Sequence, residues 1–299
     1  MVNNPETNVY RLVHAEGDGL PGLIIDIYND TAVIQAHSSG MYHARKIIAD
    51  ALLEIYPNKL RAIFDKSAET LAVNDISNGF LYGNSSENFL VKENACTFFI
   101  DFEEGQKTGF FVDQRENRKL LMTVCAGKKV LNTFCYTGGF SVFAIKAGAE
   151  FVHSVDSSKK AIEMAQKNIA VNGFDLEKNQ CFASDTLEFL KNTETMYDVI
   201  VLDPPAYAKH MSAKHNAVQG YKRLNALAMK KITKGGILFT FSCSQIIDRK
   251  LFADTITAAA IESGRQIQIL YHLSQPADHP VSIFHPEGEY LKGLVLLIN

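Results

Sequence analysis

The chain has 299 residues, of which 46% are hydrophobic and 21% charged, and its formal net charge at pH 7 is −3. This ordinary globular composition excludes a low-complexity chain, and the negative net charge means that nucleic-acid binding would require a local basic patch. No stretch approaches the roughly 18 to 20 apolar residues of a membrane-spanning helix, and the first residues show no signal-peptide pattern.

Residues 1–95 are predicted to form a small α+β domain, which is a candidate for RNA contact. Its predicted elements are strands at 9–13, 23–28 and 31–37, a helix over 40–56, and strands at 61–65 and 89–92. Asn29-Asp30 predicts a tight hairpin between the second and third strands. The helix carries apolar residues at the spacing typical of a core-facing helix: Ile47, Ile48, Ala51, Leu52 and Ile55.

Residues 96–299 are predicted to form a catalytic α/β domain. A strand at 96–102 is expected to pair back onto the 89–92 strand, and strands and helices alternate from about residue 113 onward. The predicted elements are strands at 129–133, 151–155, 180–183, 198–202 and 237–242, helices at 138–147, 158–171, 186–191, 218–232 and 249–262, and final strands at 266–273 and 291–298. This alternation predicts a parallel sheet covered on both faces, with the last two strands as an antiparallel pair at one edge.

The strand at 129–133 runs into a glycine turn, Gly138-Gly139, at the start of the next helix. Ligands of parallel sheets bind where the strands end, and glycines there let a ligand approach the backbone. The helix N-terminus would favour a negative group such as a carboxylate. The turn is not GxGxxG, so a dinucleotide is not indicated, and a tight turn without a ligand is the alternative.

Two acidic residues end the next two strands. Asp156 stands where a carboxylate typically accepts both ribose hydroxyls of an adenosine group, and Asp185 stands where an adenine amino group would lie. Either residue could instead cap the helix that follows it, and for Asp156 the two roles are compatible.

Asp203 ends the fourth strand and precedes an unusual charge pattern. The 44 residues from Pro204 to Ile247 contain seven Lys/Arg and no carboxylate. Pro204 and Pro205 hold the backbone rigidly, and Tyr207 offers a ring that could stack on a base. A carboxylate, a stiff turn and a basic stretch in this order predict a reactive site that faces a polyanion, whereas a purely structural Pro-Pro turn is the alternative.

Cys243 ends the fifth strand between two serines and is a candidate thiolate nucleophile on the same sheet edge as Asp203. Taken alone, a strand-end cysteine is more often a small buried hydrophobe, which is the interpretation for the other four cysteines. The five cysteines are widely spaced without a CxxC pair, and no HExxH occurs. We therefore expect a reduced, cytoplasmic protein without a metal site.

These motifs together resemble the class I S-adenosylmethionine methyltransferases. They resemble more closely the bacterial large-subunit rRNA methyltransferases whose studied members make 5-methylcytosine in 23S rRNA. The matching segments are 16–23, 105–115, 131–141, 155–158, 203–209, 220–222, 241–244, 278–280 and 289–293. As a set they are specific, although any one of them would be weak. Family members usually begin with an additional RNA-binding PUA domain, and nothing like it precedes Val9, so either the sequence is a truncated one or this member lacks that module.

The resemblance implies a Rossmann-like, seven-stranded methyltransferase sheet preceded by a small α+β domain, with S-adenosylmethionine as cofactor. The implied cofactor contacts are Phe110, Asp113, Arg115, Asn132, Phe134, Tyr136, Thr137, Gly138, Gly139, Asp156, Ser157, Ser184, Asp185 and Asp203. The expected partner is 23S ribosomal RNA or a large-subunit precursor. The candidate RNA contacts are Lys107, Tyr207, Lys209, Lys222 and Arg223. The sequence leaves the oligomeric state open, a homodimer included.

The implied mechanism uses Cys243 and Asp203. Carbon 5 of cytosine is a poor nucleophile, but addition of a thiolate to carbon 6 makes it enamine-like and able to attack the sulfonium methyl. Asp203 would hydrogen-bond the ring at N3. Many RNA cytosine methyltransferases carry a second cysteine directly after the proline of this motif, for product release. Here Pro205 is followed by Ala206, so release requires another base.

Three other functions are alternatives to this one. Asp-Pro-Pro followed by an aromatic residue also resembles methyltransferases that act on base nitrogens, which need no thiol. A protein that binds the cofactor and RNA without catalysis is disfavoured, because the candidate acid, thiol and cofactor motifs are all present. A nicotinamide oxidoreductase is disfavoured because the dinucleotide glycine pattern is absent.

Overall fold

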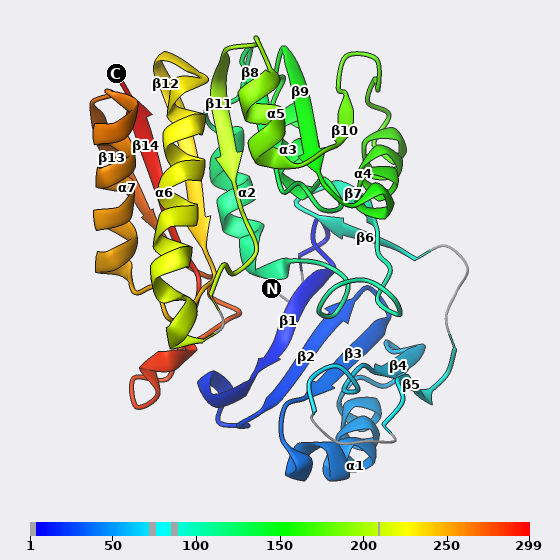
Figure 1. Ribbon diagram of the computed structural model, residues 1–299. Coiled ribbons are helices and arrows are strands. Elements are labelled where there is room, and N and C mark those ends of the chain that lie inside the picture. Colours follow the sequence, from blue (N-terminus) through cyan, green and yellow to red (C-terminus); the bar gives the residue numbers. More distant parts are fainter. Residues whose placement is uncertain (1–3, 72–75, 85–88, 209) are drawn as a thin grey trace. The chain divides into compact units, whose positions relative to one another are not determined.

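The computed structural model describes residues 4–71, 76–84, 89–208 and 210–299. The strands are β1 Val9–His14, β2 Leu23–Tyr28, β3 Thr31–Ala36, β4 Ala62–Asp65, β5 Gly79–Tyr82, β6 Leu90–Glu93, β7 Cys96–Phe99, β8 Lys129–Thr133, β9 Phe151–Asp156, β10 Cys181–Ala183, β11 Tyr197–Leu202, β12 Ile232–Ser242, β13 Ile267–Leu273 and β14 Lys292–Ile298. The α-helices are α1 Ser39–Ile55, α2 Arg115–Met122, α3 Gly139–Lys146, α4 Lys159–Val171, α5 Thr186–Asn192, α6 Lys214–Lys230 and α7 Arg249–Ser263 (Figure 1). Short 3-10 helices lie at Ala15–Asp18, Val112–Gln114, Met211–Ala213 and Pro286–Gly288.

The chain folds into two compact units. The first comprises Met1–Arg115 and Pro276–Gly288, and the second comprises Glu116–Gln275 and Glu289–Asn299. The predicted domain boundary between residues 95 and 96 falls in the turn of the β6–β7 hairpin, whose strands pair in antiparallel register from Leu90 to Phe99. The first compact unit therefore extends beyond this boundary, to Arg115. The predicted domain ranges stay a prediction.

The first unit contains a five-stranded sheet in the order β1-β2-β3-β4-β5. The predicted hairpin is confirmed, because β2 and β3 pair antiparallel up to Tyr28 and Thr31, and Asn29 takes the left-handed conformation with φ 56°. Strands β3 and β4 are parallel and are connected through α1. The unit is thus α+β, as predicted.

The buried face of α1 differs from the predicted one. Ile47 and Ile55 are 72% and 67% exposed, whereas Ala49 and Leu52 are buried in the core cluster of the sheet. The helix carries apolar residues on two neighbouring stripes, and spacing alone does not say which stripe meets the sheet. Leu52 lies on the stripe that packs, so part of the prediction is wrong.

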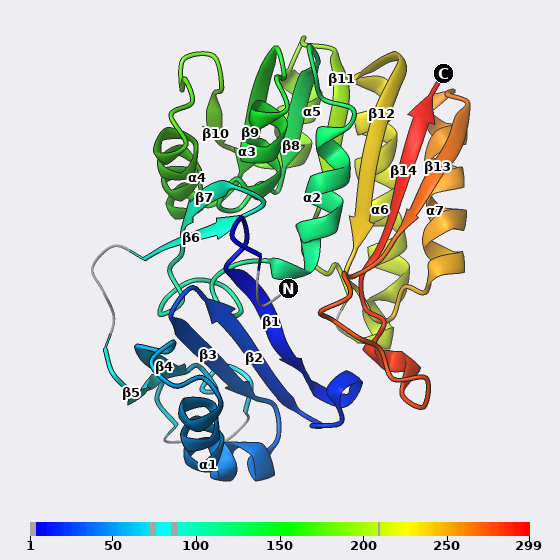
Figure 2. The same ribbon diagram turned by 180° about the vertical axis from the view of Figure 1, so that it is seen from behind.

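The second unit contains a seven-stranded sheet in the order β10-β9-β8-β11-β12-β14-β13. The first five strands in this order are parallel, and β14 pairs antiparallel with both β12 and β13. The order reverses between β8 and β11, because successive connections lead outward in opposite directions from these two strands. The predicted Rossmann-like sheet with an antiparallel pair at one edge is confirmed, with β13 as the edge strand (Figure 2).

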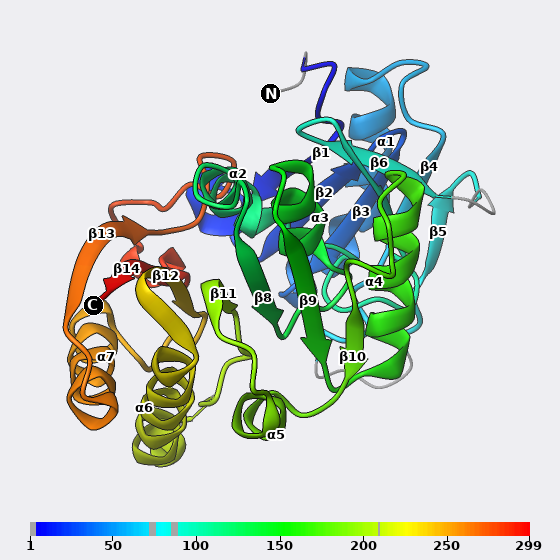
Figure 3. The ribbon, with the colours of Figure 1, turned by 90° about the horizontal axis from the view of Figure 1, so that it is seen from above.

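Helices cover both faces of this sheet, with α2, α3 and α4 on one face and α5, α6 and α7 on the other (Figure 3). Alternation along β11 builds the two cores, because Ile200 and Leu202 join the cluster under α6 and α7, while Val199 and Val201 join the cluster under α2 and α3. Within the described ranges, no helix is long and apolar enough to cross a membrane.

Candidate active site

The carboxyl ends of the five parallel strands bring most of the candidate residues to one edge of the second unit. These residues are Ser184 and Asp185 after β10, Asp156 and Ser157 at the end of β9, residues 134–139 after β8, Asp203 after β11, and Cys243 after β12. Parallel strands that pair side by side end together, so the edge follows from backbone topology. This edge, at the point where the strand order reverses, is where ligands of open α/β sheets bind.

The loop after β8 fixes the Asp156 carboxylate. Phe134, Tyr136 and Gly138 all take left-handed conformations, with φ of 52°, 46° and 79°. The Tyr136 N–H donates to Asp156 Oδ2 at 3.0 Å, and the Ser158 N–H donates to Oδ1 at 2.9 Å. Left-handed backbone is unfavourable by roughly 1–2 kcal/mol for a residue with a side chain, so the surrounding structure must impose it. The result is a half-buried carboxylate with a fixed direction.

The two glycines of this loop serve helix packing. A Cβ on Gly138 would lie 3.1 Å from the Ala165 Cβ of α4, and one on Gly139 would lie 3.3 Å from the Arg118 Cδ of α2. Asn132, buried in β8, donates through Nδ2 to Ser141 Oγ at 2.9 Å. The tight-turn alternative therefore explains the glycines in part, and their contact with a cofactor stays a prediction.

Asp185 acts as a helix cap, as one of its two interpretations predicts. Its Oδ1 accepts the Glu188 N–H of α5 at 2.9 Å. Ser184 is half-buried, and its N–H donates to the Asp156 carbonyl oxygen at 2.9 Å, which ties β10 to β9 at this edge. The cap uses one carboxylate oxygen and does not exclude a ligand contact by the other.

Tyr207, four residues after Asp203, is packed on one side against α6. Its ring centroid lies 4.7 Å from that of Tyr221 at an interplanar angle of 40°, and a Cβ on Gly220 would come within 3.0 Å of the Tyr207 ring. Burial raises the pKa of Tyr207 to about 12, and the negative charge of Asp185 adds to the shift. One ring face is thus covered, which limits base stacking to the other face.

Hydrogen bonds hold both residues that flank Cys243. Ser242 Oγ donates to Tyr221 Oη at 3.0 Å, and Ser244 Oγ donates to the carbonyl oxygen of Ala208 at 2.8 Å. The Cys243 residue itself is half-buried, and it is not part of a disulfide. The segment 242–244 is therefore held in one conformation at the end of β12.

Of the other four cysteines, Cys96, Cys125 and Cys135 are buried and Cys181 is half-buried. Burial raises the pKa of Cys125 to about 12 and raises the pKa values of Cys135 and Cys181 as well. Raised pKa values keep these thiols protonated and unreactive near neutral pH. Among the described residues, no group of three or more His, Cys, Asp or Glu side chains could hold a metal ion.

The basic residues of the acid-free window do not all lie at the carboxyl edge. Helix α6 has 17 residues and so spans about 25 Å, returning the chain to the start of β12 at the opposite edge. Lys230, Lys231 and Lys234 therefore lie at that opposite edge, so only part of the predicted basic stretch lies on the side of the candidate reactive site. Lys222 Nζ lies 3.0 Å from Glu262 Oε2 of α7, and Arg223 is exposed. Lys209 lies outside the described residues.

The remaining candidates belong to the first unit. Lys107 Nζ lies 3.1 Å from Asp113 Oδ2 and 4.4 Å from the Phe111 ring centroid. Phe110 is buried, with its ring centroid 5.0 Å from that of Phe98. Arg115 is buried, and its guanidinium donates to Asp278, as described below. Their side chains have well-defined partners within this unit, and their cofactor and RNA roles stay predictions.

Sequence comparison places the chain in a family. A family model described as S-adenosylmethionine-dependent methyltransferase matches residues 71–283. The ribosomal RNA large subunit methyltransferase I of Aeromonas salmonicida is 40% identical over 294 residues, covering 96% of this chain and 74% of that protein. The chain belongs to the S-adenosylmethionine-dependent methyltransferases. The Aeromonas hydrophila protein of the same name is 41% identical over 295 residues, with the same two coverages, 96% and 74%.

Solved structures agree with the assignment to the methyltransferases. A Streptococcus mutans protein assigned as an S-adenosylmethionine-dependent methyltransferase has a TM-score of 0.87 at 26% identity, covering 99% of this chain and 76% of that one. A second methyltransferase structure, which contains SAH, has a TM-score of 0.88 at 26% identity, covering 99% of this chain and 77% of that one. The predicted fold class and S-adenosylmethionine as cofactor are thereby confirmed.

The hydrogen-bond acceptors at the carboxyl edge of this methyltransferase fit S-adenosylmethionine. Each Asp156 oxygen accepts one backbone N–H and retains a lone pair, so the fixed carboxylate can still accept from two neighbouring hydroxyls. The ribose of S-adenosylmethionine carries such a pair of hydroxyls.

Two residues gain an importance that the sequence did not assign them. Lys292 is buried in the otherwise apolar strand β14, and Asp278 joins the segment 276–288 to the first unit. Both lie in segments that carry the family resemblance. For Lys292, a lysine at the start of an apolar stretch is the available signal, whereas Asp278 has no local signal; in neither case does the sequence reveal the partner.

Proposed function

We propose that this methyltransferase transfers a methyl group to carbon 5 of a cytosine in large-subunit ribosomal RNA, with Cys243 as the nucleophile. The names of the curated relatives, ribosomal RNA large subunit methyltransferase I, support RNA of the large subunit as substrate. The position of a cysteine at the end of the strand next to Asp203 supports carbon chemistry over nitrogen chemistry.

The observation that carries the proposal is the pairing of β11 with β12. The two strands are parallel and adjacent, and Leu202 is in register with Thr240. Val201 and Phe241 both face the core under α2 and α3. Since side chains of a strand repeat their direction every second residue, continued alternation would direct Asp203 and Cys243 to the same side of the sheet.

In the proposed reaction, Cys243 and Asp203 each have one role. The Cys243 thiolate forms a bond to carbon 6, and the electrons of the C5–C6 double bond make carbon 5 nucleophilic. S-adenosylmethionine, when bound, supplies an electrophilic methyl group on a positively charged sulfur. Asp203, in its protonated form, donates a hydrogen bond to N3 of the ring, where it offsets the negative charge that accumulates in the adduct. Loss of the carbon 5 proton to a general base then restores the double bond and expels the thiolate.

The cofactor and RNA roles that the resemblance implies are part of this proposal. Asp156 would hold the ribose and Asp185 the adenine amino group. The other implied cofactor residues are Phe110, Asp113, Arg115, Asn132, Phe134, Tyr136, Thr137, Gly138, Gly139, Ser157 and Ser184. Phosphate contacts would come from Lys107, Lys209 and Arg223. Lys222 is a weaker candidate, because Glu262 partly neutralises its charge.

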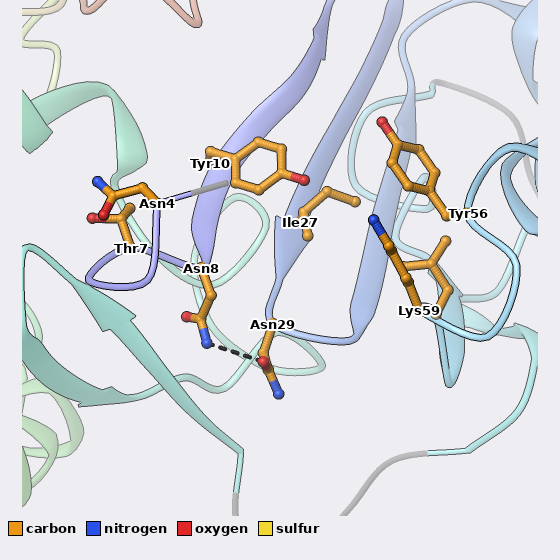
Figure 4. A pocket seen from close by; sticks show the side chains of 9 residues that line it. Asn4, Thr7, Asn8, Tyr10, Ile27, Asn29, Tyr56 and Lys59 are labelled. Atoms are coloured by element: carbon orange, nitrogen blue, oxygen red, sulfur yellow. Dashed lines mark hydrogen bonds between the residues drawn. The ribbon is translucent and has the colours of Figure 1, made fainter. Parts of the chain in front are cut away.

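We also propose that the first unit contacts the RNA through a pocket of about 150 Å³. Its lining residues are Asn4, Thr7, Asn8, Tyr10, Ile27, Asn29, Tyr56, Lys59 and Leu60. Figure 4 shows the rings of Tyr10 and Tyr56 on either side of Ile27, and Asn8 Nδ2 donating to Asn29 Oδ1, a bond of 3.0 Å. Aromatic rings, side-chain amides and a lysine are the groups that bind an unpaired nucleotide.

Tyr56→Leu tests this pocket, because leucine keeps apolar volume but removes the aromatic face. Stacking of a base on an aromatic ring contributes about 1–3 kcal/mol, so the Kd for an rRNA fragment should rise roughly 5- to 150-fold. Fluorescence anisotropy with a labelled fragment measures it. Tyr42→Leu is the matched control, since Tyr42 lies on α1, the helix that ends just before Tyr56, but its ring contacts Arg45 outside the pocket. An unchanged Kd for a folded Tyr56→Leu protein would remove the pocket from the proposal.

The reaction product tests the proposed function as a whole. Incubation with labelled S-adenosylmethionine and unmodified rRNA, followed by nucleoside mass spectrometry, should yield 5-methylcytidine. A nucleoside methylated on a base nitrogen would instead support the nitrogen-directed alternative. Measurable cofactor binding without transfer to any rRNA would favour a binding protein without catalysis.

A further inference from the structure

Lys292 is a buried lysine next to the segment that carries Cys243. It begins β14, is 4% exposed, and pairs in antiparallel register with Ser242 of β12. Its Nζ donates to the carbonyl oxygen of Ser244 at 2.8 Å. The ammonium is therefore anchored to the residue that directly follows Cys243.

We propose that Lys292 is a positioning residue, which holds the turn around Cys243 and favours the thiolate form of that cysteine. The purpose of this arrangement rests on the function proposed above. The reactivity of the Cys243 thiol, by contrast, is a property of the folded protein without RNA. A cation near a cysteine stabilises the thiolate, which is how many reactive cysteines are activated.

Packing alone does not account for a lysine at this position. The strand β14 is otherwise apolar, and Leu294, Val295 and Leu296 are buried. Removing an ammonium from water is unfavourable by several kcal/mol unless nearby groups compensate. Burial accordingly lowers the pKa of Lys292, while the charges of Cys243 and other neighbours oppose the shift. A Cys243 thiolate beside the Lys292 ammonium would offset the unfavourable free energy of burying both charged groups.

The other charged groups that act on Lys292 are engaged elsewhere. The Asp248 carboxylate caps the N-terminus of α7, and Arg249 pairs with Glu289. Arg249 further lowers the pKa of Lys292, whereas Glu289 and Asp248 raise it. On the side of α6, burial raises the pKa of Tyr221, with the nearby thiol adding to it, so this phenol stays neutral. The ammonium is thus the positive charge anchored on the turn itself.

The hydrogen bond from Lys292 completes the support of the turn. Ser242 is held by Tyr221 of α6, and the Ser244 hydroxyl donates to Ala208. Lys292 Nζ and the Ile247 N–H, at 3.2 Å, both donate to the Ser244 carbonyl oxygen. Loss of the lysine would therefore remove one of the two hydrogen bonds to the backbone immediately after Cys243, as well as the charge.

The pH dependence of Cys243 alkylation tests the proposal. Iodoacetamide reacts with the thiolate, and mass spectrometry of the Cys243 peptide over about pH 5 to 10 gives the apparent pKa of this thiol. In Lys292→Met we expect that pKa to rise by at least about one unit, which slows alkylation at neutral pH roughly tenfold. Lys292→Arg retains the charge and should keep most of the reactivity.

Controls separate this effect from general destabilisation. Lys250→Met removes an exposed lysine, paired with Asp254 on α7, and should leave the Cys243 profile unchanged. A folded Lys292→Met protein with the wild-type profile would overturn the proposal. So would a wild-type Cys243 that titrates at or above about 8.5, the ordinary value, and that measurement requires no variant to fold. If methyl transfer survives loss of Cys243 while the Lys292 shift is observed, the proposed reaction fails and this inference stands.

Discussion

Replacement of Cys243 by alanine should abolish methyl transfer to RNA. The thiolate forms the bond to carbon 6 in the proposed reaction, and no other described thiol lies at the carboxyl ends of β11 and β12. Loss of a covalent nucleophile lowers kcat by up to about 10⁶-fold in well-studied enzymes, and we expect at least about 10³-fold here. Transfer of labelled methyl to unmodified rRNA measures the rate. Binding of S-adenosylmethionine, measured by calorimetry, should be retained.

Cys181→Ala is the matched control for this substitution. Cys181 is also half-buried and lies on β10, an edge strand of the same sheet, but burial raises the pKa of its thiol. Its replacement should leave the rate within a few-fold of wild type. RNA containing 5-fluorocytosine should trap a covalent protein–RNA adduct, because fluorine cannot leave carbon 5 as a proton does. The adduct should form with Cys181→Ala and be absent with Cys243→Ala. Wild-type rates for Cys243→Ala would sink the cytosine proposal and favour a base nitrogen as acceptor.

The sheet and its edge could be predicted from the sequence because parallel strands leave a strong local signal. The buried strand Tyr197–Leu202 ends in a continuous apolar run, 199–202, and the first polar residue after it, Asp203, marks its carboxyl end. Backbone topology alone then brings Asp156, Asp203 and Cys243 to one edge. No knowledge of side-chain partners is needed for that step.

The partners of these side chains could not be predicted, because they depend on which helix packs where. Spacing gives the apolar residues of α1 but not which of two stripes faces the sheet, so Ile47 and Ile55 are misassigned. Tyr207 offers a ring in the sequence, yet Tyr221, 14 residues later, covers one face of it. Counting charges along the sequence likewise assigns Lys234 to the candidate active site, although α6 returns the chain to the opposite edge of the sheet before this residue.

The segment 276–288 gives a clear example of a long-range partner. Nothing local in Asp278-His279-Pro280 predicts that it belongs with the first unit. In the structure, Asp278 accepts two hydrogen bonds from Arg115, each of 2.9 Å, and one from the Arg11 N–H at 3.0 Å. The contacts span more than a hundred residues of sequence, and residue spacing carries no information over that distance.

This buried ion pair leads to the second large expected effect, which is on stability. Removing one partner of a buried pair leaves the other charge uncompensated and typically destabilises a protein by about 3–5 kcal/mol. Asp278→Ala should therefore lower the free energy of unfolding by about that amount, a large fraction of the 5–15 kcal/mol of a typical domain. Urea denaturation followed by circular dichroism measures it. Asp254→Ala, which removes the exposed partner of Lys250, should change stability by less than about 1 kcal/mol.

The pH dependence of the same pair has a defined sign. Burial alone would raise the pKa of Asp278, but the hydrogen bonds from His279 and Arg115, together with their charges, hold it well below its ordinary value. A depressed pKa in the folded state means that the stabilisation is present above the unfolded-state pKa, about 3.9, and is lost as the pH falls below it. Wild type should therefore lose stability between about pH 4 and pH 2 more steeply than Asp278→Ala. Parallel acid-unfolding curves for the two proteins would mean that the Asp278 carboxylate contributes no net stability, and that attachment of the segment 276–288 to the first unit depends on packing instead.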